Sequence, residues 1–177
     1  MHQSPVFFFD TVRENFLIAD PNANDEEIIR LCKLTGIWEI LAKHYGELPL
    51  DAQLAAGASL SGGEKKLFAL TRCLLRKPTI LLLDEPTTGI DPIEKFALID
   101  KMRAALTGKT VVVVDHDIIW QCRFSDEFLV LDHGQIVQRG DAGTLLSEPG
   151  LFRELHREYE TAPPHGDSTQ AVRFPSF

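Results

Sequence analysis

The chain of 177 residues lacks the features that mark several common classes of protein. Its three cysteines, Cys32, Cys73 and Cys122, are odd in number and form no C-x-x-C pair, which favours reduced thiols in a cytosolic protein over a disulfide or zinc framework. No apolar stretch approaches the roughly 20 residues that span a bilayer, and the N-terminus lacks a signal peptide's charged start and apolar core. The net charge of -8 argues against nucleic acid as the main partner, because phosphate binding needs a basic face.

A phosphate-binding loop is missing as well. Such a loop reads G-x-x-x-x-G-K-[ST] and follows a strand, with its lysine on the phosphates and its hydroxyl on magnesium. The only Gly-Lys-Thr of this chain is residues 108–110, and Arg103 stands where the first glycine belongs. This segment precedes an expected strand at 111–114 instead of following one. We interpret it as a helix-to-strand turn with Gly108 as the helix C-cap.

What the chain does contain is an apolar run that ends in two carboxylates. Residues 80–83, Ile-Leu-Leu-Leu, precede Asp84-Glu85-Pro86-Thr87, which predicts a buried parallel strand delivering both carboxylates to the carboxyl end of a sheet. Open α/β sheets bind ligands at that end. About twenty residues earlier, the turn 60–64, Leu-Ser-Gly-Gly-Glu, precedes a helix-length segment and offers backbone N–H groups to an anion. Together they predict a phosphate-handling site with a metal and a base; the alternative is a capped helix beside an acidic surface turn.

Periodicity and turn residues divide the chain into a largely helical part, up to about residue 75, and an α/β part. A polar, proline-bearing tail from residue 161 is expected to be disordered. We expect helices at 10–16, 24–34, 37–44, 92–106, 143–146 and 150–159, a loop at 45–59, strands at 80–83 and 111–114, and a hairpin formed by 127–132 and 135–138.

The order and spacing of the motifs at 60–64 and 80–87 resemble the signature motif and the Walker B strand of ATP-binding cassette (ABC) ATPases. The resemblance runs from residue 3 to about residue 159, and segments 10–41 and 150–159 resemble the exporter type. It implies an α/β fold of the P-loop NTPase (RecA-like) class: half of a parallel sheet with the ABC α-helical subdomain, the N-terminal part missing and expected before residue 1. The implied parts are a Q-loop segment (1–9), a helical subdomain ending in the signature helix (10–75), a RecA-like portion with Walker B, D-loop and H-loop (76–160) and the tail (161–177).

The resemblance also assigns catalytic and metal-binding roles. Asp84 would hold Mg²⁺, because a hard cation prefers oxygen ligands. Glu85, next in an extended chain, would point to the opposite side, toward the lytic water, as general base or orienting group. His116, after the strand 111–114, matches the switch histidine that contacts the γ-phosphate. Gln3 matches the Q-loop glutamine, which binds magnesium or the attacking water; the alternative is an exposed glutamine at a frayed terminus.

The remaining assigned residues act across a dimer interface. Ser61, Gly62 and Gly63 would bind the γ-phosphate of ATP held by the opposing subunit. Glu64 replaces the family's usual glutamine, which adds a carboxylate near a helix N-terminus and near the phosphate. Asp91 matches the D-loop, which crosses to the other subunit. A chain without its own phosphate loop could thus offer half of one composite site.

These observations lead to the hypothesis of an ATP-binding and ATP-hydrolysing subunit of an ABC transporter, with ATP and Mg²⁺ as cofactors. Its expected partners are a second nucleotide-binding domain and a membrane-spanning transporter domain, and its expected location is the cytoplasmic face of the membrane. Two alternatives stay open: a non-catalytic half-domain that lends its signature to a partner, and a soluble ABC ATPase not coupled to transport. Asp117, after His116, is closer to the importer pattern, so the direction of transport also stays open.

Overall fold

The computed structural model describes residue 1 and residues 5–8, 10–54 and 59–161. Gln3 and nearly all of the expected disordered tail lie outside these residues. The chain forms two compact units, residues 1–116 and residues 117–177. In the described ranges, none of the helices combines the length and the apolar character required to cross a bilayer.

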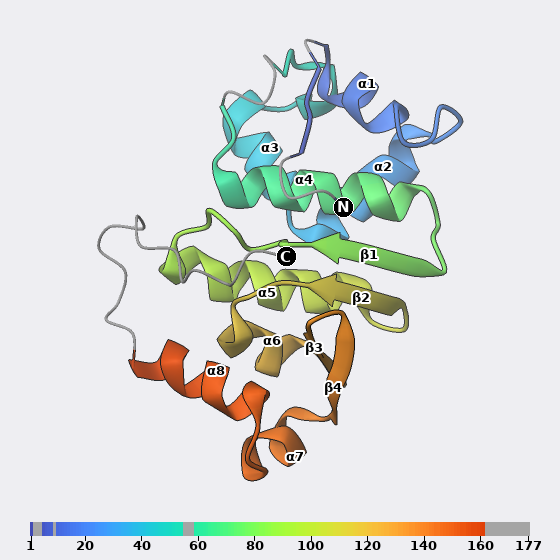
Figure 1. Ribbon diagram of the computed structural model, residues 1–177. Coiled ribbons are helices and arrows are strands. Elements are labelled where there is room, and N and C mark those ends of the chain that lie inside the picture. Colours follow the sequence, from blue (N-terminus) through green and yellow to red (C-terminus); the bar gives the residue numbers. More distant parts are fainter. Residues whose placement is uncertain (2–4, 9, 55–58, 162–177) are drawn as a thin grey trace. The chain divides into compact units, whose positions relative to one another are not determined.

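Helices dominate the first part of the first unit (Figure 1). Asn24 begins the second helix by accepting the Glu27 N–H at 2.8 Å, and three acidic residues in its first turn favour the positive end of the helix dipole. Gly36 ends that helix at φ 78°, a left-handed conformation that glycine adopts readily. The elements are α1 (Val12–Leu17), α2 (Asp25–Thr35), α3 (Trp38–Tyr45), the 3-10 turn η1 (Pro49–Asp51) and α4 (Gly62–Leu75).

The core of this helical part is apolar and aromatic. Phe16 of α1 stacks on Phe68 of α4 with ring centroids 4.0 Å apart, and both side chains are fully buried. Arg72 holds the N-terminal segment against this core: its Nε donates to the Asn15 carbonyl at 2.7 Å, and its guanidinium lies over the ring of Phe7. α4 packs against α2 and α5, which also contact each other. The helix that begins at the Ser-Gly-Gly turn is therefore a central, well-anchored element of the unit.

The α/β part of the first unit is a strand–helix–strand segment. β1 (Ile80–Asp84) and β2 (Thr110–Val114) pair in parallel from Ile80 with Thr110 to Asp84 with Val114, and α5 (Pro92–Leu106) connects them. Parallel strands need such a crossover helix. The matching register brings the carboxyl ends of both strands to the same edge, as the sequence predicted.

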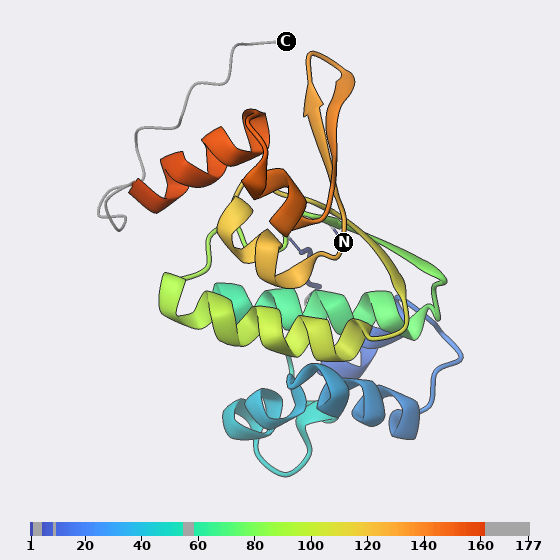
Figure 2. The ribbon, with the colours of Figure 1, turned by 90° about the horizontal axis from the view of Figure 1, so that it is seen from below.

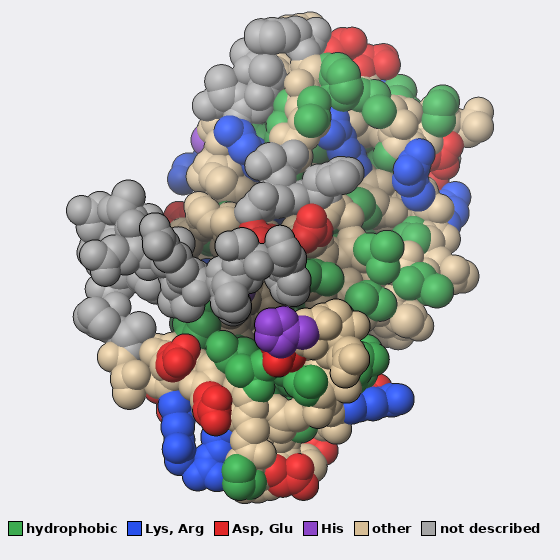
Figure 3. All heavy atoms as spheres, viewed as in Figure 1, with side chains coloured by type: hydrophobic (Ala, Val, Ile, Leu, Met, Phe, Trp, Pro, Cys, Tyr) green, Lys and Arg blue, Asp and Glu red, His purple; other side chains and the backbone are tan. Residues whose placement is uncertain are grey.

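One face of this two-stranded sheet is uncovered in the described part of the chain. Leu81 and Leu83 of β1 are buried, but four apolar side chains at alternating positions of β1 and β2 expose between 50% and 65% of their surface. Figure 3 shows hydrophobic side chains gathered over β1 and β2. The exposed side chains are Ile80, Leu82, Val112 and Val114, and we call them the apolar sheet face. Strands that are apolar on both faces normally lie inside a parallel sheet with helices on either side.

The second unit has its own small core. The strands β3 (Phe128–Asp132) and β4 (Gln135–Gly140) form an antiparallel hairpin, followed by α7 (Ala142–Ser147) and α8 (Leu151–Thr161), which lie side by side (Figure 2). The hairpin turns through His133 and Gly134, both with positive φ, as a two-residue loop matched to strand twist requires. The buried core residues are Ile118, Phe128, Val130, Leu145 and Phe152.

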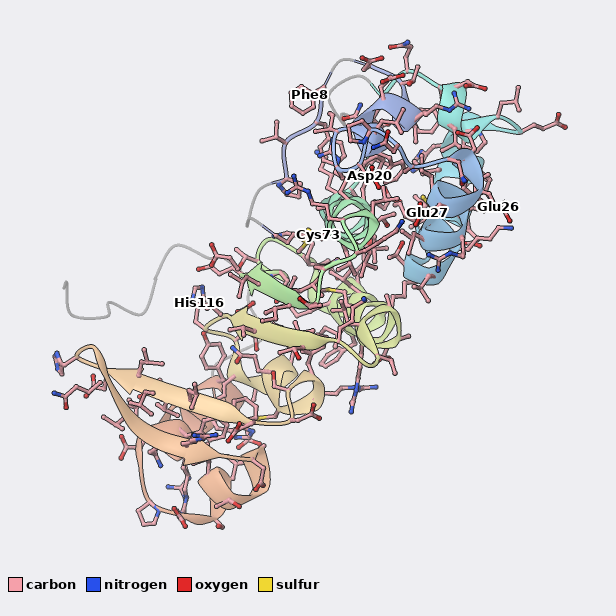
Figure 4. The ribbon with its side chains drawn as sticks, turned by 90° about the vertical axis from the view of Figure 1, so that its right-hand side faces the viewer. Phe8, Asp20, Glu26, Glu27, Cys73 and His116 are labelled. Atoms are coloured by element: carbon pink, nitrogen blue, oxygen red, sulfur yellow. The ribbon has the colours of Figure 1, made fainter. Side chains whose placement is uncertain are left out.

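Three features of local structure were not predicted from the sequence. The helix α6 (Ile118–Phe124), whose Ile118 and Trp120 are buried, was not expected. The sequence puts Cys73 on the apolar face of a helix, which predicts a core residue, but Cys73 is only half-buried. Phe8 is 49% exposed and points away from the helices (Figure 4), whereas Phe7 packs edge-on against Phe68. Neighbouring side chains of extended backbone point to opposite sides, so Phe7 and Phe8 cannot both turn inward; Phe9, the third residue of this apolar run, lies outside the described residues.

Candidate functional site

The two expected carboxylates lie where β1 ends. Asp84 is the last residue of β1 and is exposed. Glu85 has φ 42°, so the chain turns sharply there, and the expectation of an extended backbone at Glu85 was wrong. A left-handed conformation is uncommon for a residue with a side chain, and such residues gather at functional sites. The Glu85 N–H donates to the carbonyl of Val114 at 2.8 Å, which ties this turn to the end of β2.

The turn directs the Glu85 carboxylate to His116. Nε2 of His116 lies 3.3 Å from Oε1 of Glu85, and the hydroxyl of Thr88 donates to Oε2 at 3.1 Å. The Glu85 side chain is 21% exposed and that of His116 is 51% exposed. Figure 4 marks His116 where the chain leaves β2. Glu85 and His116, which the sequence assigned to one reaction, are thus in contact. Both oxygens of the Glu85 carboxylate have a partner, and the imidazole is exposed to a ligand.

A second contact joins the same two chain segments. The hydroxyl of Thr87, which is 1% exposed, donates to Oδ2 of Asp115 at 3.3 Å. The turn itself is closed by the Thr88 N–H, which donates to the Glu85 carbonyl at 3.3 Å. Thr87, Thr88 and Asp115 were not singled out from the sequence. Their signal was their position beside the acidic pair and beside the histidine at the two strand ends.

Lys66 of α4 also reaches this turn, and sequence reasoning missed it. Its side chain is 4% exposed, and its Nζ donates to the Glu85 carbonyl at 3.1 Å. Burial lowers the pKa of Lys66, while the carboxylates of Asp115, Glu85 and Asp84 raise it. The sequence carries little signal for it: on a helix, Lys66 shares its face with residues three before and four after it, Gly63 and Leu70, and the structure shows that both are buried.

The Ser-Gly-Gly turn forms the N-terminus of α4 and a capping box. The Glu64 N–H donates to the Ser61 hydroxyl at 3.3 Å, and the Ser61 N–H donates to Oε2 of Glu64 at 2.7 Å. The other Glu64 oxygen lies 3.5 Å from Nε2 of His44. The unusual carboxylate at position 64 therefore occupies the helix N-terminus, where an anion is favoured.

The Ser-Gly-Gly turn lies against residues 89–90 of its own chain. A Cβ atom at Gly62 would lie 3.2 Å from the carbonyl oxygen of Gly89 and 3.4 Å from Cδ1 of Ile90, so only glycine fits there without displacement. Asp91 is exposed, and its carbonyl accepts the N–H of Lys95 at 2.9 Å as α5 begins. The residues of the two motifs thus form one contiguous patch beside the α4 N-terminus.

The described residues can supply part of a magnesium site. No group of three or more His, Cys, Asp or Glu side chains with a metal-binding arrangement occurs among them. Asp84 presents one exposed carboxylate at the carboxyl end of β1. Mg²⁺ at nucleotide sites takes one or two carboxylates together with phosphate oxygens and water, so Asp84 fits a metal held jointly with a nucleotide.

Comparisons with known proteins agree with the resemblance. The family described as ABC transporter matches residues 1–88. The mycobactin import ATP-binding/permease protein IrtB of Mycobacterium tuberculosis is 32% identical over 163 residues, which are 90% of this chain and 27% of that protein. The mating factor M secretion protein mam1 of Schizosaccharomyces pombe is 38% identical over 137 residues, which are 77% of this chain and 10% of that protein.

A solved structure is similar along almost the whole chain. It is a bacterial Atm1-family ABC exporter with ATP bound, which matches with a TM-score of 0.77 and 30% identity over 93% of this chain and 28% of that one. The chain therefore spans about a quarter or less of the length of these relatives. The predicted α/β fold, part of a P-loop NTPase domain, is confirmed.

Proposed function

We propose, from the premise that this chain belongs to the ABC transporter family of ATP-binding domains, that it works as part of an ATP-hydrolysing subunit that powers transport across a membrane. ATP binding and hydrolysis are properties of that family. The observation that carries the proposal is the contact of 3.3 Å between His116 and Glu85, formed by the ends of two paired parallel strands. A surface acidic turn without a chemical role needs no histidine there.

The geometry suggests how these residues divide the work. The Glu85 carboxylate would orient the attacking water and accept its proton, once a water displaces Thr88 or His116 from one of its oxygens. His116, half-exposed beside it, would donate to the γ-phosphate. Asp84 would hold Mg²⁺, which would neutralise phosphate charge. The turn 85–88, fixed by Val114 and by its own hydrogen bonds, keeps the base in place before substrate arrives.

The signature residues would serve a second site. Ser61 begins a helix of 14 residues whose N-terminus favours negative charge, and we infer that Ser61, Gly62 and Gly63 face the γ-phosphate of ATP on a second ATP-binding domain. Glu64 would have to turn away from the Ser61 N–H for a phosphate to approach it. Asp91, beside this turn, would contact the same partner. The fused ATP-binding/permease relative supports a membrane-spanning partner and a position at the cytoplasmic face of the membrane.

One observation favours a second candidate function, a half-domain that completes a partner's site without hydrolysing ATP itself. The sequence has no G-x-x-x-x-G-K-[ST] motif, and its Gly-Lys-Thr at 108–110 follows the end of α5, where the Lys109 N–H donates to the carbonyl of Leu106 at 3.1 Å. A phosphate loop would instead precede a helix. ATP would then bind next to the residues of this chain only where another polypeptide segment supplies that loop.

Replacing the matched segment of the Atm1-family exporter with residues 1–161 of this chain tests the proposal. The exporter supplies the remaining parts of the ATP site, so the replaced protein should hydrolyse ATP, and the exporter without the segment should not. A folded, ATP-binding replacement protein without hydrolysis would contradict the catalytic proposal and favour the half-domain. Mixing the replaced protein with a hydrolysis-deficient exporter would then show whether the signature turn of this chain still supports turnover.

A further inference from the structure

Lys66 is a buried lysine in the second turn of α4, in contact with the candidate catalytic turn 85–88. Its side chain is 4% exposed, which is rare for lysine, because burying an ammonium group costs free energy unless it is paired. The neighbouring Lys65 is only partly buried. Packing alone gives no reason for an ammonium group here, since a methionine side chain of similar length would fill the space without that cost.

The ammonium group meets Glu85, one of three described residues other than glycine that have a positive φ. Nζ donates to the Glu85 carbonyl at 3.1 Å, the same oxygen that accepts the Thr88 N–H at 3.3 Å. A positive φ costs free energy at a residue other than glycine, so the surrounding contacts must hold Glu85 in place. Burial lowers the pKa of Lys66, and the negative charges of Asp115, Glu85 and Asp84 oppose this effect.

We propose that Lys66 is a positioning residue for Glu85: its hydrogen bond to the Glu85 carbonyl holds the turn 85–88 in the conformation that keeps the carboxylate at His116. This inference rests on the proposed role of Glu85 in hydrolysis. In this proposal Lys66 acts on the reaction only through the position of Glu85. Its loss should therefore reduce the rate of the chemical step more than it reduces ATP binding.

Hydrogen exchange of the 177-residue chain, followed by mass spectrometry at low concentration, tests the positioning role without ATP. Lys66→Met should speed exchange in the peptide covering residues 85–88 by about 10- to 100-fold, the range expected for losing a hydrogen bond from a charged donor. Exchange in α2 should stay the same. Lys66→Arg, which keeps a cationic donor, should restore protection, and Lys65→Met, the matched control, should leave it unchanged.

The same variants in the segment-replaced exporter give a second readout. Lys66→Met should lower kcat by about tenfold or more, while KM for ATP changes by less than about threefold, and Lys65→Met should alter neither. Two results would overturn the inference in favour of a purely structural lysine. The first is wild-type protection at 85–88 in Lys66→Met. The second is loss of protection throughout the first unit in both Lys66 variants. If Glu85→Gln leaves turnover intact, the proposed function fails instead, whatever the exchange data show.

Discussion

The apolar sheet face gives a quantitative prediction about the chain in isolation. Ile80, Leu82, Val112 and Val114 expose between 50% and 65% of their surface. Burying one such side chain fully contributes about 1.5–3 kcal/mol, so covering all four would contribute about 4–7 kcal/mol. Two copies that cover each other's faces gain about twice that amount, about 8–14 kcal/mol, which exceeds an association cost near the low end of its range, about 4–6 kcal/mol, by about 2–10 kcal/mol. The isolated chain should therefore self-associate at micromolar to millimolar concentration.

The perturbation is Leu82→Lys, which places a charge at the centre of this face. Leu82 is 65% exposed, so the substitution removes about 1–2 kcal/mol of burial from each face. For a dimer this loss amounts to about 2–4 kcal/mol, or a dissociation constant raised about 30- to 1000-fold. The fold of the unit should persist, because the side chain points away from the buried Leu81 and Leu83.

Sedimentation velocity over a range of concentrations measures the effect. The matched control is Leu48→Lys, because Leu48 is 71% exposed but lies outside the sheet, before η1. We expect the wild-type chain and Leu48→Lys to associate similarly and Leu82→Lys to remain monomeric. A monodisperse, well-protected wild-type monomer would refute the reasoning and would favour a stand-alone half-domain.

Three further predictions concern binding, capping and pH. Calorimetry should detect no micromolar binding of Mg-ATP to the isolated chain, because its sequence lacks a phosphate loop; a clear micromolar isotherm would contradict this. Ser61→Ala should lower the free energy of unfolding by about 0.5–2 kcal/mol through loss of the α4 cap, whereas Ser147→Ala, outside this unit, serves as the control in urea titrations. Arg13 holds the pKa of Asp25 below its ordinary value through a side-chain hydrogen bond, so Asp25→Asn should destabilise the protein near neutral pH, and the difference should vanish in acid as Asp25 becomes protonated. A difference that grows in acid would contradict the ion-pair account.

Local signals predicted the regular elements well. The helix expected at 24–34 is α2, with Asn24 as its N-cap and Gly36 as its C-cap, and the apolar runs at 80–83 and 111–114 became paired strands. The helix α6 was not predicted from the sequence. Such short helices depend on tertiary packing, here the burial of Trp120.

Half of the site was predictable, because the carboxyl ends of parallel strands must meet. That rule brings Glu85 and His116 to one edge from their positions in the sequence alone. The left-handed turn at Glu85 could not be predicted, since nothing in its residue type favours a positive φ. Lys66 was missed for a related reason: its partner is a backbone carbonyl, 19 residues away in sequence, whose direction depends on that turn.

Glu85→Gln in the segment-replaced exporter tests the central claim most directly. Glutamine keeps the shape of the side chain but cannot accept the proton of the attacking water, so ATP hydrolysis should fall by about 10²–10⁴-fold. ATP binding should stay within about threefold of the unaltered replacement protein, and the control Glu26→Gln, at an exposed position in α2, should change neither quantity. Near-full turnover by Glu85→Gln would contradict the account.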